Sequence, residues 1–321
     1  MLFLRSNLVH LIVSEKMRMS RLNIRITIGL CAKNAERTIR DCLKSISNQT
    51  YPKELINIIV VDGQSKDKTV EIAKQELLTS GIKSKILSDN GMGLGVARQA
   101  VVENTGNKYI IWVDADARVF EDFVQKQIEF MEKNPRVCVA TGGYIRRKYA
   151  HAGLPASLES LGKCVGSLTY ISAQGNRGIP PNDASIYRVK ALKQVGGFDK
   201  NIRGASEDED VISRMRKKGW VVKVNKRAKF YVVSRGTWQS VWTRYVWYGY
   251  GGHFLSHKTK DSHFLMYSIP LVHFFDGFRF GVKAYRLTSE RESFLFPLRN
   301  VFLAVGRWYG YAKAHIEGYG H

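Results

Sequence analysis

The chain has 321 residues, 44% of them hydrophobic, which is enough to fold around one large core. Its 50 Lys and Arg residues outnumber 28 Asp and Glu residues to give a formal charge of +22. This favours an anionic partner: nucleic acid, an acidic membrane surface or a phosphorylated substrate. Four cysteines without CxxC spacing exclude a structural zinc motif and favour reduced thiols in a cytosolic protein.

No cleavable signal sequence is recognisable, and no clean run of about 18 apolar residues predicts a membrane-spanning helix. After an N-terminal tail (1–23), strand-like and helix-like runs alternate along the chain. Apolar runs predict strands at 24–31, 56–61, 85–87 and 109–113. Helical periodicity predicts helices at 36–47, at 67–78 and, after a glycine-rich loop, up to residue 100. The alternation predicts an α/β fold with a Rossmann-like, mostly parallel sheet flanked by helices.

The second half of the domain is less regular. A helix is predicted at 120–133, a strand at 137–144, and a loop at 172–186 that is rich in Gly and Pro. A short helix ends at Gly196-Gly197. Ser206 and Glu209 have the spacing of a capping box, which predicts a helix that begins there and ends near residue 218.

The composition changes beyond Arg235, where aromatic and basic residues become frequent. We therefore place a boundary between an α/β domain at 24–235 and a helical, membrane-associating C-terminal region at 236–321. Residues 211–229 hold eight basic residues and no acid, which would attract anionic lipid. The amphipathic aromatics Trp238, Trp242 and Trp247 suit the headgroup level of a bilayer, and residues 264–280 suit its interface.

Three aspartates follow predicted strands. Asp62 ends the second strand, and Asp114 and Asp116 end the strand at 109–113. Ligands of parallel α/β sheets bind beyond the carboxyl ends of the strands, so these carboxylates are candidate site residues. A pair spaced like Asp114 and Asp116 can share Mg²⁺ or Mn²⁺ and thereby neutralise a diphosphate leaving group. Solvated turn aspartates are the alternative for each.

The glycine run from Gly91 to Gly95 fails the dinucleotide-binding test, because Val96 and Arg98 occupy the positions of the third glycine. A tight loop that approaches a ligand is the better interpretation. The acidic run at 207–210 begins a predicted helix, where the backbone N–H groups and the helix dipole stabilise carboxylates as a plain acidic N-cap. Because four like charges repel one another, a nearby cation or basic ligand is the alternative interpretation. His253 and His257 are spaced i, i+4 without an intervening carboxylate, which is more typical of core or interface histidines than of metal ligands.

Seven ordered segments resemble the family-2 glycosyltransferases of the GT-A fold. They comprise residues 26–36, 60–69, 93–98, 114–116, 184–188, 195–199 and 207–208, and the resemblance spans about residues 24–250. It implies an inverting, metal-dependent glycosyltransferase that uses a nucleotide-sugar donor. Asp208 would be the general base, and Asp114 and Asp116 would hold Mg²⁺ or Mn²⁺.

The resemblance also assigns the other site residues. The donor nucleotide would contact Ala32, Asn34, Glu36, Asp62, Arg98 and Asp114. The acceptor and donor sugar would meet Asn182, Ser185 and Glu207. Two departures matter: no histidine stands at 233–235 to supply a third metal ligand, and Gln239 and Arg244 lack the Gln-x-x-Arg-Trp spacing of processive synthases. Transfer of a single sugar is therefore preferred.

Two other classes of function stay open. A non-catalytic nucleotide-sugar binder would keep the fold without the reaction, and a basic nucleic-acid-binding protein would account for the charge. No RNA- or DNA-binding module is recognisable, so nucleic acid is not the expected partner. We expect a lipid-linked or glycan acceptor and a peripheral or monotopic location on the cytoplasmic side of the cell membrane, on an anionic surface.

Overall fold

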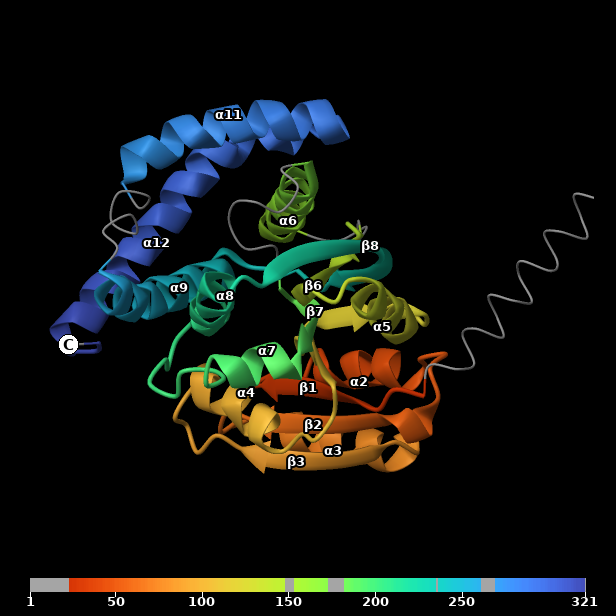
Figure 1. Cartoon of the computed structure of the whole chain (residues 1–321). Coiled ribbons are helices and arrows are strands. Elements are labelled where there is room, and N and C mark those ends of the chain that lie inside the picture. Colours follow the sequence, from red (N-terminus) through yellow and green to blue (C-terminus); the bar gives the residue numbers. More distant parts are fainter. Residues whose placement is uncertain (1–22, 148–152, 173–181, 235, 261–268, 321) are drawn as a thin grey trace, which may run out of the picture.

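The computed structural model describes residues 23–147, 153–172, 182–234, 236–260 and 269–320 (Figure 1). Nearly all of the predicted N-terminal tail therefore lies outside the described residues, as do parts of the segments at 172–186 and 264–280. Cys42 and Cys138 are buried, and all four cysteines are free thiols. No helix among the described residues is both long and apolar enough to cross a membrane.

The described strands form one eight-stranded mixed sheet in the order β3-β2-β1-β4-β7-β6-β8-β5. Their bounds are β1 Ile26–Ala32, β2 Ile56–Asp62, β3 Lys83–Ser88, β4 Tyr109–Val113, β5 Ala117–Val119, β6 Val137–Tyr144, β7 Ala184–Arg188 and β8 Val221–Val232. The half from β3 to β4 is parallel, as predicted. The β4–β7, β6–β7 and β5–β8 pairs are antiparallel, whereas β6 and β8 are parallel.

Helices cover both faces of this sheet (Figure 1). One face packs against α2 (Ile39–Ser47), α3 (Thr69–Ser80) and α5 (Phe123–Lys133). The other packs against α4 (Leu94–Glu103), α7 (Val189–Gln194) and α8 (Glu207–Lys217). The central strands β1 and β4 are therefore buried on both sides, which explains why, apart from Thr27, they consist of apolar residues and do not alternate with polar ones. The predicted fold class is confirmed.

Two predictions about local structure were wrong. Residues 184–186 are not loop but the beginning of β7, which inserts between β4 and β6. The capping box at Ser206 does not form: Ser206 has a φ of 80°, and its side chain makes no cap hydrogen bond. The 19-residue α6 (Leu154–Ser172) was not anticipated at all.

Two glycines of the glycine-rich loop lie against protein backbone. A Cβ added at Gly93 would lie 2.5 Å from the Arg203 carbonyl oxygen, and one at Gly95 would collide with the Asp199 carbonyl. The absence of side chains therefore lets the start of α4 pack against residues 199–203, the segment that leads into α8.

Beyond residue 235 the described chain is helical, with α9 (Trp238–Thr259), α11 (Pro270–Thr288), the short η2 (Arg291–Leu295) and α12 (Phe296–Ile316). Helices α9 and α12 cross in close contact: a Cβ at Gly249 would meet the Arg307 backbone, and one at Gly310 the Val246 carbonyl. Helix α11 packs along α12, and both approach α6 above the sheet (Figure 1).

Candidate active site

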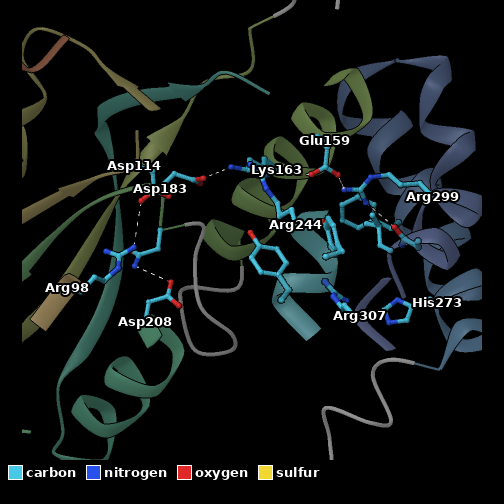
Figure 2. Close-up of a pocket in the computed structure, with 18 residues that line it drawn as sticks. Arg98, Asp114, Glu159, Lys163, Asp183, Asp208, Arg244, His273, Arg299 and Arg307 are labelled. Carbon is cyan, nitrogen blue, oxygen red and sulfur yellow. Dashed lines mark hydrogen bonds and ion pairs between the residues drawn. The ribbon is translucent and has the colours of Figure 1, made fainter. Parts of the chain in front are cut away.

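A pocket of about 440 Å³ lies between the sheet and the C-terminal helices (Figure 2). Asp114, Asn182, Asp183 and Asp208 line it from the sheet and the start of α8, with Arg98 from α4. The opposite wall comes from α6, α9, α11 and α12, with Glu159, Lys163, Arg244, Tyr245, Tyr248, His273, Arg299 and Arg307 among its residues. Of the first wall, the sequence predicted Arg98, Asp114, Asn182 and Asp208 but not Asp183, and it predicted no residue of the second wall.

Four predicted donor residues gather at the carboxyl ends of β1 and β2. Ala32 pairs with Asp62 in the strand register, and the Asp62 carboxylate accepts the Ser65 N–H. Asn34 Oδ1 accepts the Lys66 N–H at 2.8 Å, and Glu36 Oε2 accepts the Lys68 N–H at 3.2 Å. The loops that follow the two strands are thus bound to each other, which makes the edge of the sheet a fixed surface for a ligand.

Arg98 is buried against the ring of Trp112, with its guanidinium carbon 4.8 Å from the ring centroid. Its Nε lies 2.7 Å from Glu207 Oε1, and an Nη lies 3.7 Å from Asp114 Oδ1. Burial raises the pKa of Glu207, whereas the adjacent guanidinium favours its charged form. Arg98 thus forms an ion pair with the buried Glu207 and also lies close to Asp114, on the side of the pocket that the sheet provides.

Asp114, Asp116 and Asp183 present carboxylate oxygens that all lie within 4.8 Å of one another. A purely oxygen donor set of three partly exposed carboxylates fits Mg²⁺ or Mn²⁺. Asp183 is the ligand that sequence reasoning missed, although the neighbouring Asn182 was selected. It offers a candidate third ligand where the sequence lacks a histidine at 233–235. Its position follows from β7, because the Asp114 N–H donates to the Asp183 carbonyl.

Two cations face this acidic triad of Asp114, Asp116 and Asp183. Lys163 of α6 forms an ion pair with Asp183, and Arg244 of α9 lies 3.3 Å from Asp116 and 3.6 Å from Glu159. Burial opposes ionisation of Asp183, but the Lys163 ammonium holds its pKa below the ordinary value. Asp183 is therefore charged. Burial, which outweighs the nearby Arg98 guanidinium, raises the pKa of Asp114 to about 7, and a bound divalent cation would favour the charged form of that carboxylate.

Asp208 differs from its acidic neighbours. Arg98 neutralises Glu207, and Arg214 and Lys258 neutralise Asp210, so cations do lie near the run 207–210. Asp208 makes no ion pair among the described residues, and Asn182 Nδ2 donates to its Oδ2 at 3.3 Å. One carboxylate of the run thus remains open to the pocket (Figure 2).

Asn182 is oriented by two groups behind it, the hydroxyls of Ser185 and Tyr187. Ser185 is fully buried in β7, so it contacts Asn182 rather than the pocket. The structure thus brings Asp114, Asn182, Asp183 and Asp208 together, with Asp116 beside them. Ser185 and Glu207 lie behind these residues and do not line the pocket. The roles assigned to these residues remain predictions.

A mostly parallel sheet with helices on both faces, and with three carboxylates gathered beside the carboxyl end of β4, has the arrangement of a GT-A type nucleotide-sugar transferase fold. A family model described as Glycosyl transferase family 2 matches residues 27–196, more than half of the chain. The protein belongs to this family.

Curated relatives include the poly-beta-1,6-N-acetyl-D-glucosamine synthase of Staphylococcus epidermidis, 26% identical over 71% of this chain and 54% of that protein. Glycosyltransferase AglE of Haloferax volcanii is 26% identical over 41% of this chain and 42% of its own length. The chain thus spans about half the length of these relatives. The fold is similar to the mannosyltransferase PcManGT from Pyrobaculum calidifontis in complex with GDP-Man and Mn²⁺, with a TM-score of 0.56 and 15% identity over 91% of this chain and 75% of that one.

Proposed function

We propose that the protein transfers a single sugar from a nucleoside-diphosphate sugar to an acceptor hydroxyl with inversion of configuration. The observation that supports this most directly is the pocket that Asp208 shares with Asp114 and Asp183, two members of the acidic triad. One unpaired carboxylate and one divalent-cation site facing the same cavity are the two elements that a single displacement requires. A protein that only binds a nucleotide sugar would need the residues that hold the donor, but no carboxylate to deprotonate an acceptor.

In this reaction the residues of the chain have separate tasks. Asp208 takes the proton of the acceptor hydroxyl while the oxygen of that hydroxyl bonds to the anomeric carbon of the donor sugar. The bond from the anomeric carbon to the donor diphosphate breaks at the same time. Asn182 orients the Asp208 carboxylate through its amide. Asp114, Asp116 and Asp183 would hold Mg²⁺ or Mn²⁺, which supplies neutralising charge for the leaving diphosphate. Asn34, Glu36 and Asp62 form the surface that we assign to the nucleoside.

The acceptor side supports an anionic, lipid-linked acceptor. Arg307 lines the pocket with its guanidinium carbon 5.1 Å from the Tyr245 ring centroid, and it forms no hydrogen bond or ion pair among the described residues. The more distant charge of Glu209 acts on it, but a guanidinium that lines a pocket without a direct ion pair suits a phosphate or carboxylate on the acceptor.

The domain arrangement that we propose is a catalytic domain at 24–235 and an acceptor-side, membrane-interfacial region at 236–321. Helix α11 buries Gly277, Gly281 and Ala284 but exposes Leu271, Phe275 and Phe278 by 67%, 62% and 61%. Exposed aromatic side chains on a helix with a narrow buried stripe favour docking onto a membrane surface. We place this surface on the cytoplasmic side, where nucleotide sugars would meet the site.

The test has two stages. Thermal-shift screening of nucleotide sugars with Mn²⁺ or Mg²⁺ identifies the donor, because a ligand bound by the folded state raises the melting temperature. Transfer to lipid-phosphate and glycan acceptors is then followed by NMR of the anomeric proton. The proposal expects a product of inverted configuration. Donor binding without transfer or hydrolysis would favour the binder, and salt-dependent nucleic-acid binding without donor binding would favour the remaining alternative.

A further inference from the structure

Three histidines meet where α9 crosses α12, outside the pocket described above. His253 and His257 lie one turn apart on α9, and His315 lies near the end of α12. One ring nitrogen of each lies within 4.8 Å of the others. The i, i+4 spacing puts His253 and His257 on the same helix face, and the glycine contacts between the two helices bring His315 close to that face.

The orientation of His253 is fixed by a group behind it. Its Nδ1 lies 2.6 Å from the Tyr319 carbonyl oxygen, which can only accept, so Nδ1 carries the proton. Nε2 consequently presents its lone pair toward the cluster, 3.3 Å from His315 Nδ1. An imidazole that donates one N–H to a backbone carbonyl and directs the other nitrogen at its neighbours has the arrangement found in metal-ligating histidines.

The carbonyl that orients His253 is itself held in place. The Tyr319 hydroxyl accepts the Arg203 N–H at 2.6 Å, and its ring stacks on Tyr250 with a centroid separation of 4.6 Å. His253 is completely buried, so its ring cannot turn away into solvent. The cluster is thus preorganised by the fold rather than assembled by mobile surface side chains, which lowers the cost of binding a ligand.

We propose that His253, His257 and His315 form a second metal site, for a divalent transition metal of the zinc class, that joins α9 to α12. Imidazole nitrogens suit Zn²⁺, Co²⁺, Ni²⁺ and Cu²⁺, whereas the acidic triad offers only oxygens to harder cations. The nearby charge of Lys258 is neutralised by Asp199 and Asp210, so it does not oppose a cation here.

The site has a consequence for the pocket because its two helices contribute to the pocket wall. Helix α9 carries Arg244, and α12 carries Arg307. A metal bound near the C-terminal ends of both helices would fix the position of α9 relative to α12. It would thereby fix the position of the Arg244 guanidinium relative to that of Arg307. This inference does not depend on the proposed reaction, since the binding of the metal is measured directly.

The experiment uses untagged, chelator-treated full-length protein and Co²⁺ as a spectroscopic probe. Co²⁺ with three imidazoles in a four- or five-coordinate site absorbs visible light strongly, whereas octahedral carboxylate or aqueous Co²⁺ absorbs weakly. We expect strong absorption that saturates at one equivalent, is lost on adding Zn²⁺, and accompanies a higher melting temperature with Zn²⁺. His257→Ala and His315→Ala should weaken Zn²⁺ binding at least tenfold, because loss even of a group that only supports a ligand costs about 10–100-fold.

Two control variants distinguish this site from other sites. His273→Ala removes a histidine of the pocket, and Asp116→Asn impairs the acidic triad; both should retain the strong Co²⁺ spectrum. Should wild-type protein give only the weak octahedral spectrum, or should His257→Ala and His315→Ala bind Zn²⁺ as tightly as wild type, the proposal is overturned. Because His257 and His315 are exposed, these variants are expected to fold, and circular dichroism checks this.

Discussion

Arg98 and Glu207 form a buried ion pair, with Arg98 Nε 2.7 Å from Glu207 Oε1 and the two side chains only 6% and 3% exposed. The pair joins the helix that follows the glycine-rich loop to the first residue of α8. Asp208, the proposed base, is the next residue along the chain. The position of that carboxylate relative to Asp114 is therefore set by an interaction beneath the pocket.

Arg98→Met should destabilise the fold by about 3–5 kcal/mol, because it leaves the Glu207 carboxylate buried without its counter-ion. Urea unfolding followed by circular dichroism measures this. Arg98→Met combined with Glu207→Met should recover a large part of the loss, since two apolar side chains of similar volume leave no buried charge. A single variant as stable as wild type would mean that Glu207 is not held by Arg98.

Asp208→Asn should lower the rate constant of transfer by about 10²–10⁴-fold, because an amide cannot take the acceptor proton. Donor affinity, measured by calorimetry with the nucleotide sugar and Mn²⁺, should change little. The control is Glu71→Gln, which removes an exposed carboxylate on α3, an element that does not line the pocket. Equal loss of activity in both variants would contradict a specific role for Asp208.

Asp116→Ala should abolish activity and metal-dependent donor binding together, because the triad loses one of three carboxylates. The released Arg244 guanidinium would then face Glu159 alone. Asp122→Ala, which removes a surface carboxylate paired with Lys126, is the control and should behave as wild type. Undiminished transfer in excess EDTA would show that the acidic triad does not act through a metal.

Much of the first half of the fold could be predicted because its signals are local. Helix α3, for example, ends at Gly81, where a φ of 68° favours a residue without a Cβ. Strand β7 could not be recognised, because its five residues follow a Gly- and Pro-rich stretch and its structure depends on pairing with β4 and β6. Tertiary pairing decided the conformation there, not the local sequence.

The donor-side carboxylates could be found for the same reason, since each follows a recognisable strand. The opposing wall could not, because Lys163 and Arg244 reach the acidic triad only through the packing of α6 and α9. One signal was present: Glu159 and Lys163 are charged residues spaced i, i+4, on the same face of a mostly apolar segment. The close contact of α9 and α12 depends on Gly249 and Gly310, where a Cβ would collide with the backbone of the other helix. The sequence alone does not show which helices these glycines bring together.

The membrane proposal now depends on α11 more than on the basic run at 211–229. Within that run Arg214 is bound to Asp210, so it is not free for lipid. Helix α11 carries its own exposed cations, Arg279, Lys283 and Arg286, beside the exposed phenyl rings. Truncation after residue 235 would remove a wall of the pocket, and point variants are therefore the sharper test.

The full-length protein should float with vesicles that contain phosphatidylglycerol, and less so as salt rises, because each basic residue near the surface contributes about 1 kcal/mol. Phe275→Asp combined with Phe278→Asp should weaken binding at least tenfold, since removing two phenyl rings from an apolar interface costs more than about 1.4 kcal/mol. Leu78→Asp, at an 86% exposed position on α3, is the matched control and should float as wild type does. If the full-length protein stays at the bottom of the gradient at low salt, α11 does not dock on lipid. A water-soluble acceptor then becomes the better proposal, because the pocket and its Arg307 do not themselves require a membrane.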